Sequence, residues 1–219
     1  KYHSAERVDA AFVQVQKSWN DYFAYTTVDT PDDNVNTFMR YWLPYQAKVA
    51  FDVGRVISFY YWGIGRGFGF RDTSQDTIAV TISNPQKAME RIQLLSRQMR
   101  KDGKVYHHFH GDGQGEFTYH CDDPLWFMLA VTEYLKETGD FGLLADKQPF
   151  IDSEPDTILQ HMFSVVNYAK NNLGKHGLPI FGRGDWNDTL DYIGGDEGGE
   201  SVWGAMFYAA MLNLFIELL

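Results

Sequence analysis

The chain has 219 residues, 44% of them hydrophobic and 16% aromatic, so it can bury a sizeable core and does not have the composition of a disordered segment. Its formal net charge of −10 argues against nucleic acid or an anionic membrane surface as a partner, because both are bound by basic patches. The single cysteine, Cys121, excludes an internal disulfide, and no signal-peptide pattern opens the chain. We therefore expect a cytoplasmic location and no membrane span.

The first quarter of the chain is predicted to be helical. Apolar residues recur at three- and four-residue spacing over 5–25, and the spacing resumes after a turn at 30–34. We expect Pro44 to interrupt this second helix and 45–61 to form a further helix, buried on several faces. Arg55 is a cation of that helix, and a buried arginine needs an anionic or polar partner.

Residues 63–72 read Gly-Ile-Gly-Arg-Gly-Phe-Gly-Phe-Arg-Asp, which predicts a loop because four glycines oppose any regular element. The string is not a dinucleotide-binding fingerprint, since no βαβ pattern surrounds it, and it lacks the Lys-Ser/Thr of a P-loop. Two arginines on a flexible scaffold nevertheless suit an oxyanion. The alternative interpretation is a turn whose arginines pair with Asp72 and Asp76.

Three further helices are predicted between 84 and 172. Asn84-Pro85 opens the first, Asp122-Asp123-Pro124 caps the second, over 125–138, and the third covers 157–172. His161 lies among core positions of the third helix, so we interpret it as a core histidine. The first helix has one apolar face, formed by Ala88, Ile92, Leu95 and Met99.

Histidines gather between the first two of these helices. The segments 106–110 and 120–121 contain four histidines and Cys121, which are ligand types that zinc prefers. No paired cysteine motif accompanies them. We therefore favour a polar pocket with hydrogen-bonded histidines and expect no metal.

Residues 182–191, Gly-Arg-Gly-Asp-Trp-Asn-Asp-Thr-Leu-Asp, hold three carboxylates, an indole and an amide within ten positions. One interpretation is a loop that caps a helix through Asp185, Asn187 or Asp188. Another is a sugar site, because the flat face of Trp186 beside carboxylates suits a sugar ring. A calcium loop of the EF-hand type is disfavoured, since Leu190 stands at the glycine position and no closing glutamate follows.

Taken along the whole chain, helices alternate with polar loops that contain glycine. This alternation predicts an all-α fold, either a helical toroid or a layered bundle. The chain ends within a strongly apolar helix without a cap, which indicates a fragment. In such a fragment the last helix is expected to expose Val202, Met206, Ala209, Met211, Leu212, Leu214, Phe215 and Leu218.

Five motifs, in order and with matching spacing, resemble the glycoside hydrolase family 94 phosphorylases. They are Trp-Leu-Pro-Tyr-Gln at 42–46, the glycine-rich stretch 63–76, Asp-Asp-Pro-Leu-Trp at 122–126, Glu-Thr-Gly-Asp at 137–140 and Asp-Trp-Asn-Asp at 185–188. The resemblance runs from about residue 34 to the C-terminus. That family includes cellobiose, cellodextrin, laminaribiose, cellobionate and chitobiose phosphorylases.

The resemblance implies that 1–219 is part of an (α/α)6-barrel catalytic domain. The first 30 or so residues would be a helical linker, and flanking β-sandwich domains would lie outside this chain. The implied reaction is inverting phosphorolysis of a β-linked disaccharide or oligosaccharide to an α-sugar 1-phosphate, a hexosyltransferase activity. Inorganic phosphate would be a co-substrate, with no further cofactor, and the full-length protein would be a homodimer.

The same resemblance assigns roles to individual residues. Asp188, the second aspartate of Asp-Trp-Asn-Asp, would be the general acid, and Arg71 would contact phosphate. The implied sugar-binding residues are Arg55, Arg66, Asp72 and Trp186. One acid with arginines is the set that phosphorolysis needs, because phosphate is already an anion at neutral pH and no base has to activate water.

Two other functions stay open at this point. An inverting hydrolase on the same barrel would pair Asp188 with a base such as Glu197 or Glu200, and it would release sugar without phosphate. A non-catalytic carbohydrate-binding helical module would keep Trp186 and the arginines but would be indifferent to Asp188→Asn.

Overall fold

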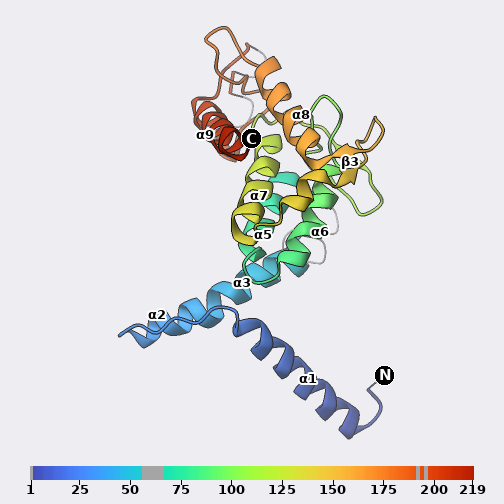
Figure 1. The fold of residues 1–219 in the computed structure, drawn as a ribbon, viewed down its shortest axis with the longest axis vertical. Coiled ribbons are helices and arrows are strands. Elements are labelled where there is room, and N and C mark those ends of the chain that lie inside the picture. The colour runs from blue at the N-terminus through green and yellow to red at the C-terminus, as the bar shows by residue number, and fades with distance from the viewer. Residues whose placement is uncertain (1, 56–66, 191–192, 195–196) are drawn as a thin grey trace. The chain divides into compact units, whose positions relative to one another are not determined.

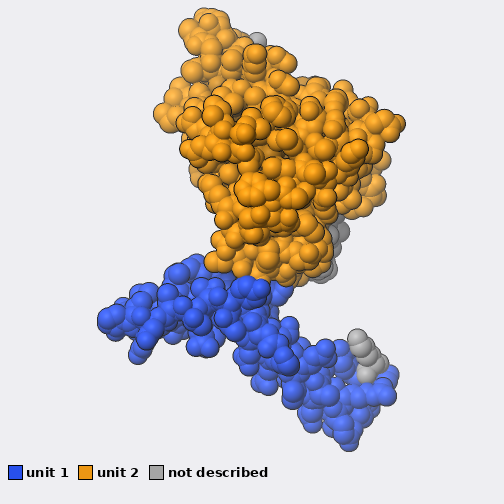
Figure 2. All heavy atoms as spheres, viewed as in Figure 1, with its two compact units in different colours: residues 1–50 blue, residues 51–219 orange. Residues whose placement is uncertain are grey.

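The structure is a computed structural model that describes residues 2–55, 67–190, 193–194 and 197–219. It is mostly helical and divides into two compact units, residues 1–50 and 51–219, which Figure 2 colours separately. Within the described ranges, none of the helices combines the length and apolar composition needed to cross a bilayer. The all-α prediction is confirmed in its main point, since the strands are only two residues long.

Unit 1 consists of two helical runs (Figure 1). The first is α1, Ala5–Phe23, as predicted. The second contains α2, Asp33–Thr37, the π-helical η1, Phe38–Trp42, and α3, Leu43–Val49. Aromatic side chains join the two runs, because Trp19 lies 5.4 Å from Tyr45 between ring centroids.

Pro44 does not interrupt the second run, contrary to the prediction. Its ring would clash with the carbonyl four residues earlier in an α-helix, and it has no N–H to donate. The preceding segment instead makes wider π turns, so that the Leu43 N–H bonds to the carbonyl of Phe38. The chain therefore stays helical through α3 and into the π-helical η2, Ala50–Gly54.

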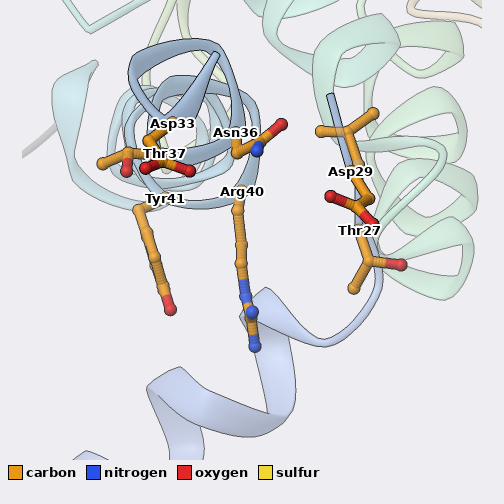
Figure 3. A pocket seen from close by; sticks show the side chains of 8 residues that line it. Thr27, Asp29, Asp33, Asn36, Thr37, Arg40 and Tyr41 are labelled. Atoms are coloured by element: carbon orange, nitrogen blue, oxygen red, sulfur yellow. The ribbon is translucent and has the colours of Figure 1, made fainter. Parts of the chain in front are cut away.

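An open cavity of about 530 Å³ lies within unit 1 (Figure 3). Residues 27–29 and side chains of α2 and η1 line it, and Arg40 is the one cation among the lining residues, with Asp29 and Asp33 as carboxylates. None of the residues that the sequence assigns to the site lines this cavity. The residues that the sequence assigns to the site all belong to unit 2.

Helix α7, Asp123–Thr138, is the centre of unit 2. Ten of its sixteen residues are buried, and it contacts four other helices (Figure 1). These are α5, Phe70–Val80, α6, Pro85–Ser96, α8, Ile158–Asn171, and α9, Val202–Leu218. The predicted apolar face of α6 is confirmed, since Ala88, Ile92 and Leu95 are fully buried; Met99 is also buried but lies beyond the end of the helix.

Helix α5 begins within the stretch that the sequence predicts to be a loop. Its buried positions include hydroxyl residues, which give no apolar stripe to recognise. Each of three hydroxyls instead bonds to the backbone carbonyl four residues earlier, which satisfies it inside the core: Ser74 to Phe70, Thr77 to Thr73 and Thr81 to Thr77. Arg71 and Asp72 consequently lie in the first helical turn.

A small antiparallel sheet fixes where α5 starts. It consists of β1, Phe68–Gly69, β2, His108–Phe109, and β3, Gly115–Glu116. Gly67 has φ +73°, and a Cβ there would collide with the carbonyl oxygen of Phe109. Just beyond the sheet, the Phe70 N–H donates to the carbonyl of His107 at 2.9 Å. The first turn of α5 is thus held beside His107.

The other elements are short connections. They comprise the 3₁₀ turns η3, Phe141–Ala145, and η4, Asp188–Leu190, and the paired strands β4, Lys147–Gln148, and β5, Asp156–Thr157. His161 is buried as predicted. Its Nδ1 lies 2.9 Å from the carbonyl oxygen of Thr157, and its ring stacks on Phe150.

The described helices of unit 2 do not form a closed ring (Figure 1). Helix α9 exposes Val202 and Met206, at 60% and 68%, as the sequence predicts. Met211 and Phe215 are buried instead, because α9 packs on α7 and adds these two side chains to the core. The predicted exposure is therefore wrong at those two positions, and Leu212, Leu214 and Leu218 are only half-buried.

Candidate active site

The loop that contains Asp185 and Asp188 is tied to the segment preceding α7. The Arg183 N–H donates to the carbonyl of Tyr119 at 3.3 Å, and the Cys121 N–H donates to that of Gly184 at 3.1 Å. Gly182 has φ +63°, and a Cβ there would collide with the Tyr119 carbonyl oxygen, so the close approach requires glycine. This backbone pairing brings the loop to the start of α7.

Arg71 joins that loop to the first turn of α5 and the start of α7. Its NH1 donates to the backbone carbonyl of Asp185 at 3.1 Å and lies 3.4 Å from the carboxylate of Asp122. Its NH2 donates to Oδ1 of Asp188 at 2.6 Å. Burial alone would lower the pKa of Arg71, but the carboxylates of Asp122 and Asp188 raise it well above its usual value. The guanidinium is therefore always charged.

The two aspartates of the loop occupy opposite environments. Asp188 opens the short turn η4, and its side chain is 70% exposed. Asp185 is buried, and its Oδ1 accepts from the backbone and side-chain N–H groups of Asn187 at 2.8 and 3.0 Å. Its Oδ2 accepts from the Ser201 hydroxyl at 2.6 Å. Asp185 therefore shapes the loop, and Asp188 is the carboxylate that a ligand can reach.

The indole of Trp186 is exposed to solvent on one side and stacks on a neighbouring indole on its opposite side. It is 49% exposed, and its ring stacks on Trp203 of α9 with centroids 6.1 Å apart. Trp203 in turn stacks on Trp126 of α7 at 6.4 Å. The arrangement is a supported flat surface two residues from Asp188, which is the geometry that favours a sugar ring.

Two buried acids lie beneath Arg71. Asp122 is fully buried, and its Oδ2 accepts from the Trp126 indole N–H at 2.9 Å. Asp123 is also buried, and its Oδ2 lies 2.8 Å from Nδ1 of His107. Burial raises the pKa of each acid to about 7. Asp122 is the N-cap residue of α7, but its side chain makes no capping hydrogen bond, which corrects the predicted capping role.

Two of the histidines that the sequence singles out, His107 and His120, lie together at this point and are hydrogen-bonded, as predicted. The rings of His107 and His120 stack with centroids 4.0 Å apart and planes 7° from parallel, and Nδ1 of His120 lies 2.6 Å from the Thr118 hydroxyl. Together with Asp123, the two histidines bring ligand atoms within 4.8 Å of one another, a set that zinc accepts. The nitrogen lone pairs of parallel rings do not converge on one point, so this arrangement suits hydrogen bonding better than chelation.

Arg55 and Asp72 form a neighbouring ion-pair group. Nε and NH2 of Arg55 donate to the two carboxylate oxygens of Asp76 at 2.7 and 3.0 Å, and its NH1 lies 3.4 Å from Asp72. The expected anionic partner of Arg55 is thus confirmed. The proposed pairing of loop arginines with Asp72 and Asp76 is wrong for Arg71, which pairs with acids outside its own helix. Arg66 lies outside the described residues.

Residues 18–219 match the family model for the catalytic domain of the glycosyl hydrolase 94 superfamily. The chain belongs to this family. The match covers all the residues that form the candidate site.

Three curated proteins are similar to this chain over most of its length. The solabiose phosphorylase of Paenibacillus borealis is 34% identical over 87% of this chain and 23% of its own length. The N,N'-diacetylchitobiose phosphorylase of Vibrio furnissii is 30% identical over 100% of the chain and 30% of its own length. The cyclic beta-(1,2)-glucan synthase NdvB of Rhizobium meliloti (strain 1021) is 34% identical over 97% of the chain and 8% of its own length. The chain therefore spans less than a third of each of these relatives.

For a glycosyl hydrolase 94 domain, the sequence predicted part of the candidate site. It identified Asp188, Trp186 and Arg71 and placed His107 in a histidine group, but it assigned no site role to the supporting residues Asp122, Asp123, Trp126 and Trp203. One signal was present in the Asp-Asp-Pro-Leu-Trp motif. Its acid and indole are four positions apart, so they share one helix face and can bond to each other.

Proposed function

We propose that this chain provides the acid-bearing part of a disaccharide phosphorylase active site. The reaction is inverting transfer of a hexosyl group from a β-linked disaccharide or oligosaccharide to inorganic phosphate, which makes the protein a hexosyltransferase. The observation that carries the proposal is the contact of 2.6 Å between Asp188, an exposed carboxylate, and Arg71, an anchored guanidinium. The family match and the two relatives that are phosphorylases by name support it.

In the proposed mechanism Asp188 gives a proton to the leaving glycosidic oxygen, and a phosphate oxygen forms the new bond to C1 from the opposite face. Arg71 holds the phosphate through charge-assisted hydrogen bonds. Phosphate needs no activating base, and Asp185, the other described acid of the loop, is occupied by Asn187 and Ser201. One accessible acid and one fixed cation are consistent with these roles, in which Asp188 donates the proton and Arg71 binds phosphate.

The sugar side of the proposed site is built around Trp186. Its exposed face would carry the apolar face of the non-reducing sugar, and hydroxyl groups would bind to Arg55, Arg66 and Asp72. Carboxylate and guanidinium groups that already pair, as Arg55 and Asp72 do, are fixed in orientation before a ligand arrives. Such preorganisation lowers the entropic cost of binding the sugar.

We also propose how the site is embedded in the full-length protein. The helices of unit 2 would be part of an (α/α)6 barrel, with the first 30 or so residues as a helical linker and β-sandwich domains elsewhere in the full-length protein. The enzyme would be a cytoplasmic homodimer and would use no cofactor other than its co-substrate phosphate.

The hydrolase alternative requires a second carboxylate to activate water. Glu200 is poorly suited to this, because its Oε1 accepts from the backbone N–H of His176 and lies 3.1 Å from Nδ1 of the same residue. Its Oε2 accepts from the backbone N–H of Leu178 at 3.3 Å. These contacts tie Glu200 to the 174–178 turn. Glu197, which is exposed, is then the remaining acid of the two considered.

Phosphate dependence tests the proposed function. The full-length protein is incubated with a panel of β-linked disaccharides, including cellobiose, laminaribiose and chitobiose, with and without inorganic phosphate. We expect an α-sugar 1-phosphate to form from at least one of them, and only when phosphate is present. Sugar release at the same rate in phosphate-free buffer would establish a hydrolase instead. Binding without turnover, unchanged in Asp188→Asn, would establish a binding module.

A further inference from the structure

The guanidinium of Arg71 has a buried end and an accessible end. NH1 is held by the Asp185 carbonyl at 3.1 Å and by the fully buried Asp122 at 3.4 Å. NH2 contacts Asp188, whose side chain is 70% exposed, while that of Arg71 is 11% exposed. The buried contacts fix the cation in place. The contact with Asp188 is the one that another anion can replace without disturbing the core.

Acidic groups outnumber basic groups around this guanidinium. The titratable groups that influence Arg71 or its partners are Asp72 in α5, Asp122 and Asp123 at the start of α7, Asp188 in the loop, His107 next to β2, and His120. Burial and the charge of Arg71 lower the pKa of His107, which keeps it neutral. A phosphate bound at NH2 would lie beside the Asp188 carboxylate that it displaces, and protonation of that carboxylate removes the repulsion between the two anions.

We propose that phosphate displaces Asp188 from Arg71, and that the freed Asp188 carboxylate takes up the proton that it later gives to the leaving sugar. This inference rests on the proposed function and adds an order of events to it. Asp188 is the group that takes the proton because it loses its cationic partner when phosphate arrives, whereas Asp122 keeps its contact with NH1. Binding of the nucleophile thus prepares the acid.

The proposed exchange balances in protons and electrons. Ionised Asp188, phosphate and one proton from solvent become bound phosphate and protonated Asp188. In the reaction a phosphate oxygen bonds to C1, the glycosidic bond breaks with its electron pair on the leaving oxygen, and that oxygen receives the Asp188 proton. Release of the sugar phosphate then leaves an ionised Asp188, which can pair with Arg71 again.

Proton uptake on phosphate binding tests this inference without any turnover. Inorganic phosphate is titrated into the full-length protein without sugar, at pH 6.5, by calorimetry in buffers of different ionisation enthalpy. We expect the wild type to take up about one proton more per bound phosphate than Asp188→Asn, because the amide cannot be protonated in this range. We also expect Asp188→Asn to bind phosphate more tightly, since no carboxylate competes for NH2.

Asp122→Asn is the matched control, because it removes the neighbouring buried acid and leaves the exchange at NH2 possible. The inference predicts that this variant keeps the proton uptake. Equal uptake in the wild type and Asp188→Asn overturns the inference, as does uptake that is lost only in Asp122→Asn. An enzyme that turns over phosphate but binds none without sugar also overturns it, although the proposed function then survives. An enzyme with no phosphate-dependent turnover contradicts the proposed function itself.

Discussion

Trp126 donates its indole N–H to the buried carboxylate of Asp122, one helical turn earlier, at 2.9 Å. The same carboxylate oxygen lies 3.4 Å from the Arg71 guanidinium, while the Trp126 ring stacks on Trp203 beneath Trp186. One side chain therefore supports both halves of the candidate site, the cation proposed to bind phosphate and the indole proposed to bind sugar. A change at Trp126 should therefore affect the binding of both proposed substrates.

Trp126→Phe separates these two roles, because phenylalanine keeps an aromatic ring and removes the donor. Leaving a buried carboxylate oxygen without this donor costs about 1–3 kcal/mol, so the melting temperature should fall. Looser positioning of Arg71 should also raise KM for phosphate more than KM for the disaccharide. Initial-rate kinetics with each substrate varied in turn checks this, and an unchanged phosphate KM would limit the role of the indole N–H to stability.

Asp188→Asn should abolish turnover and leave the fold intact. The amide has nearly the shape of the carboxylate, and the side chain is exposed, so unfolding should be unaffected. Loss of general-acid assistance should lower kcat by at least about 100-fold. Turnover and near-ultraviolet circular dichroism are compared with the wild type. Retention of more than a tenth of the rate would exclude Asp188 as the acid.

Arg71→Ala should raise KM for phosphate much more than KM for the disaccharide, because a charge-assisted contact with an oxyanion is lost while sugar contacts remain. Asp72→Ala is the matched comparison from the next position of the same helical turn, and it should weaken the sugar side first. Kinetics of both variants in both substrates decide the assignment. Equal rises in the two constants for Arg71→Ala would make Arg71 a structural residue.

The helices with periodic apolar faces could be predicted from the sequence, and the polar helix could not. The stripe of α6 lies in the core as expected, because burial of a repeating apolar face is a local property of the chain. Helix α5 buries Thr73, Ser74 and Thr77, and the hydroxyls of Ser74 and Thr77 donate to backbone carbonyls of the same helix. Such residues resemble a loop in sequence, so the element was missed.

In the candidate site, too, the residues of a single motif could be predicted from the sequence, whereas contacts between distant segments could not. Asp188 and Trp186 were found because they lie in one dense motif. The partner of Asp188 is 117 positions away, and that of Trp186 lies in α9, so neither pairing follows from spacing along the chain. Asp185 and Asp188 are both aspartates of one motif, and the structure distinguishes them because Asp185 is buried and accepts from Ser201 and Asn187, whereas Asp188 is exposed.

Trp203→Ala should affect the sugar side selectively. Removing this ring leaves Trp186 without the surface on which it stacks, so the exposed indole should become disordered and KM for the disaccharide should rise, with KM for phosphate little changed. Trp203→Phe restores a ring and should recover much of the loss. Disaccharide and phosphate kinetics for both variants check this, and a rise confined to phosphate would place the role of Trp203 elsewhere.

The raised pKa of Asp122 predicts how stability depends on pH. In the folded state the carboxyl has a pKa of about 7, well above its value of about 4 in an unfolded chain, so the folded state binds the extra proton between those limits. The contribution of Asp122 is therefore most favourable below about pH 4 and is lost as pH rises to 7, by roughly 1.4 kcal/mol for each unit of the shift. Asp123 acts in the same direction.

Asp122→Asn removes one of these two titrations, so its melting temperature should fall less steeply between pH 4.5 and 7.5 than that of the wild type. The slope of melting temperature against pH is the informative quantity. The amide also changes the contacts with Trp126 and Arg71, so it shifts the melting temperature itself at every pH. Differential scanning calorimetry across this range measures it. Parallel slopes for the two proteins would show that Asp122 is ionised throughout, with Arg71 and Trp126 fully compensating its burial.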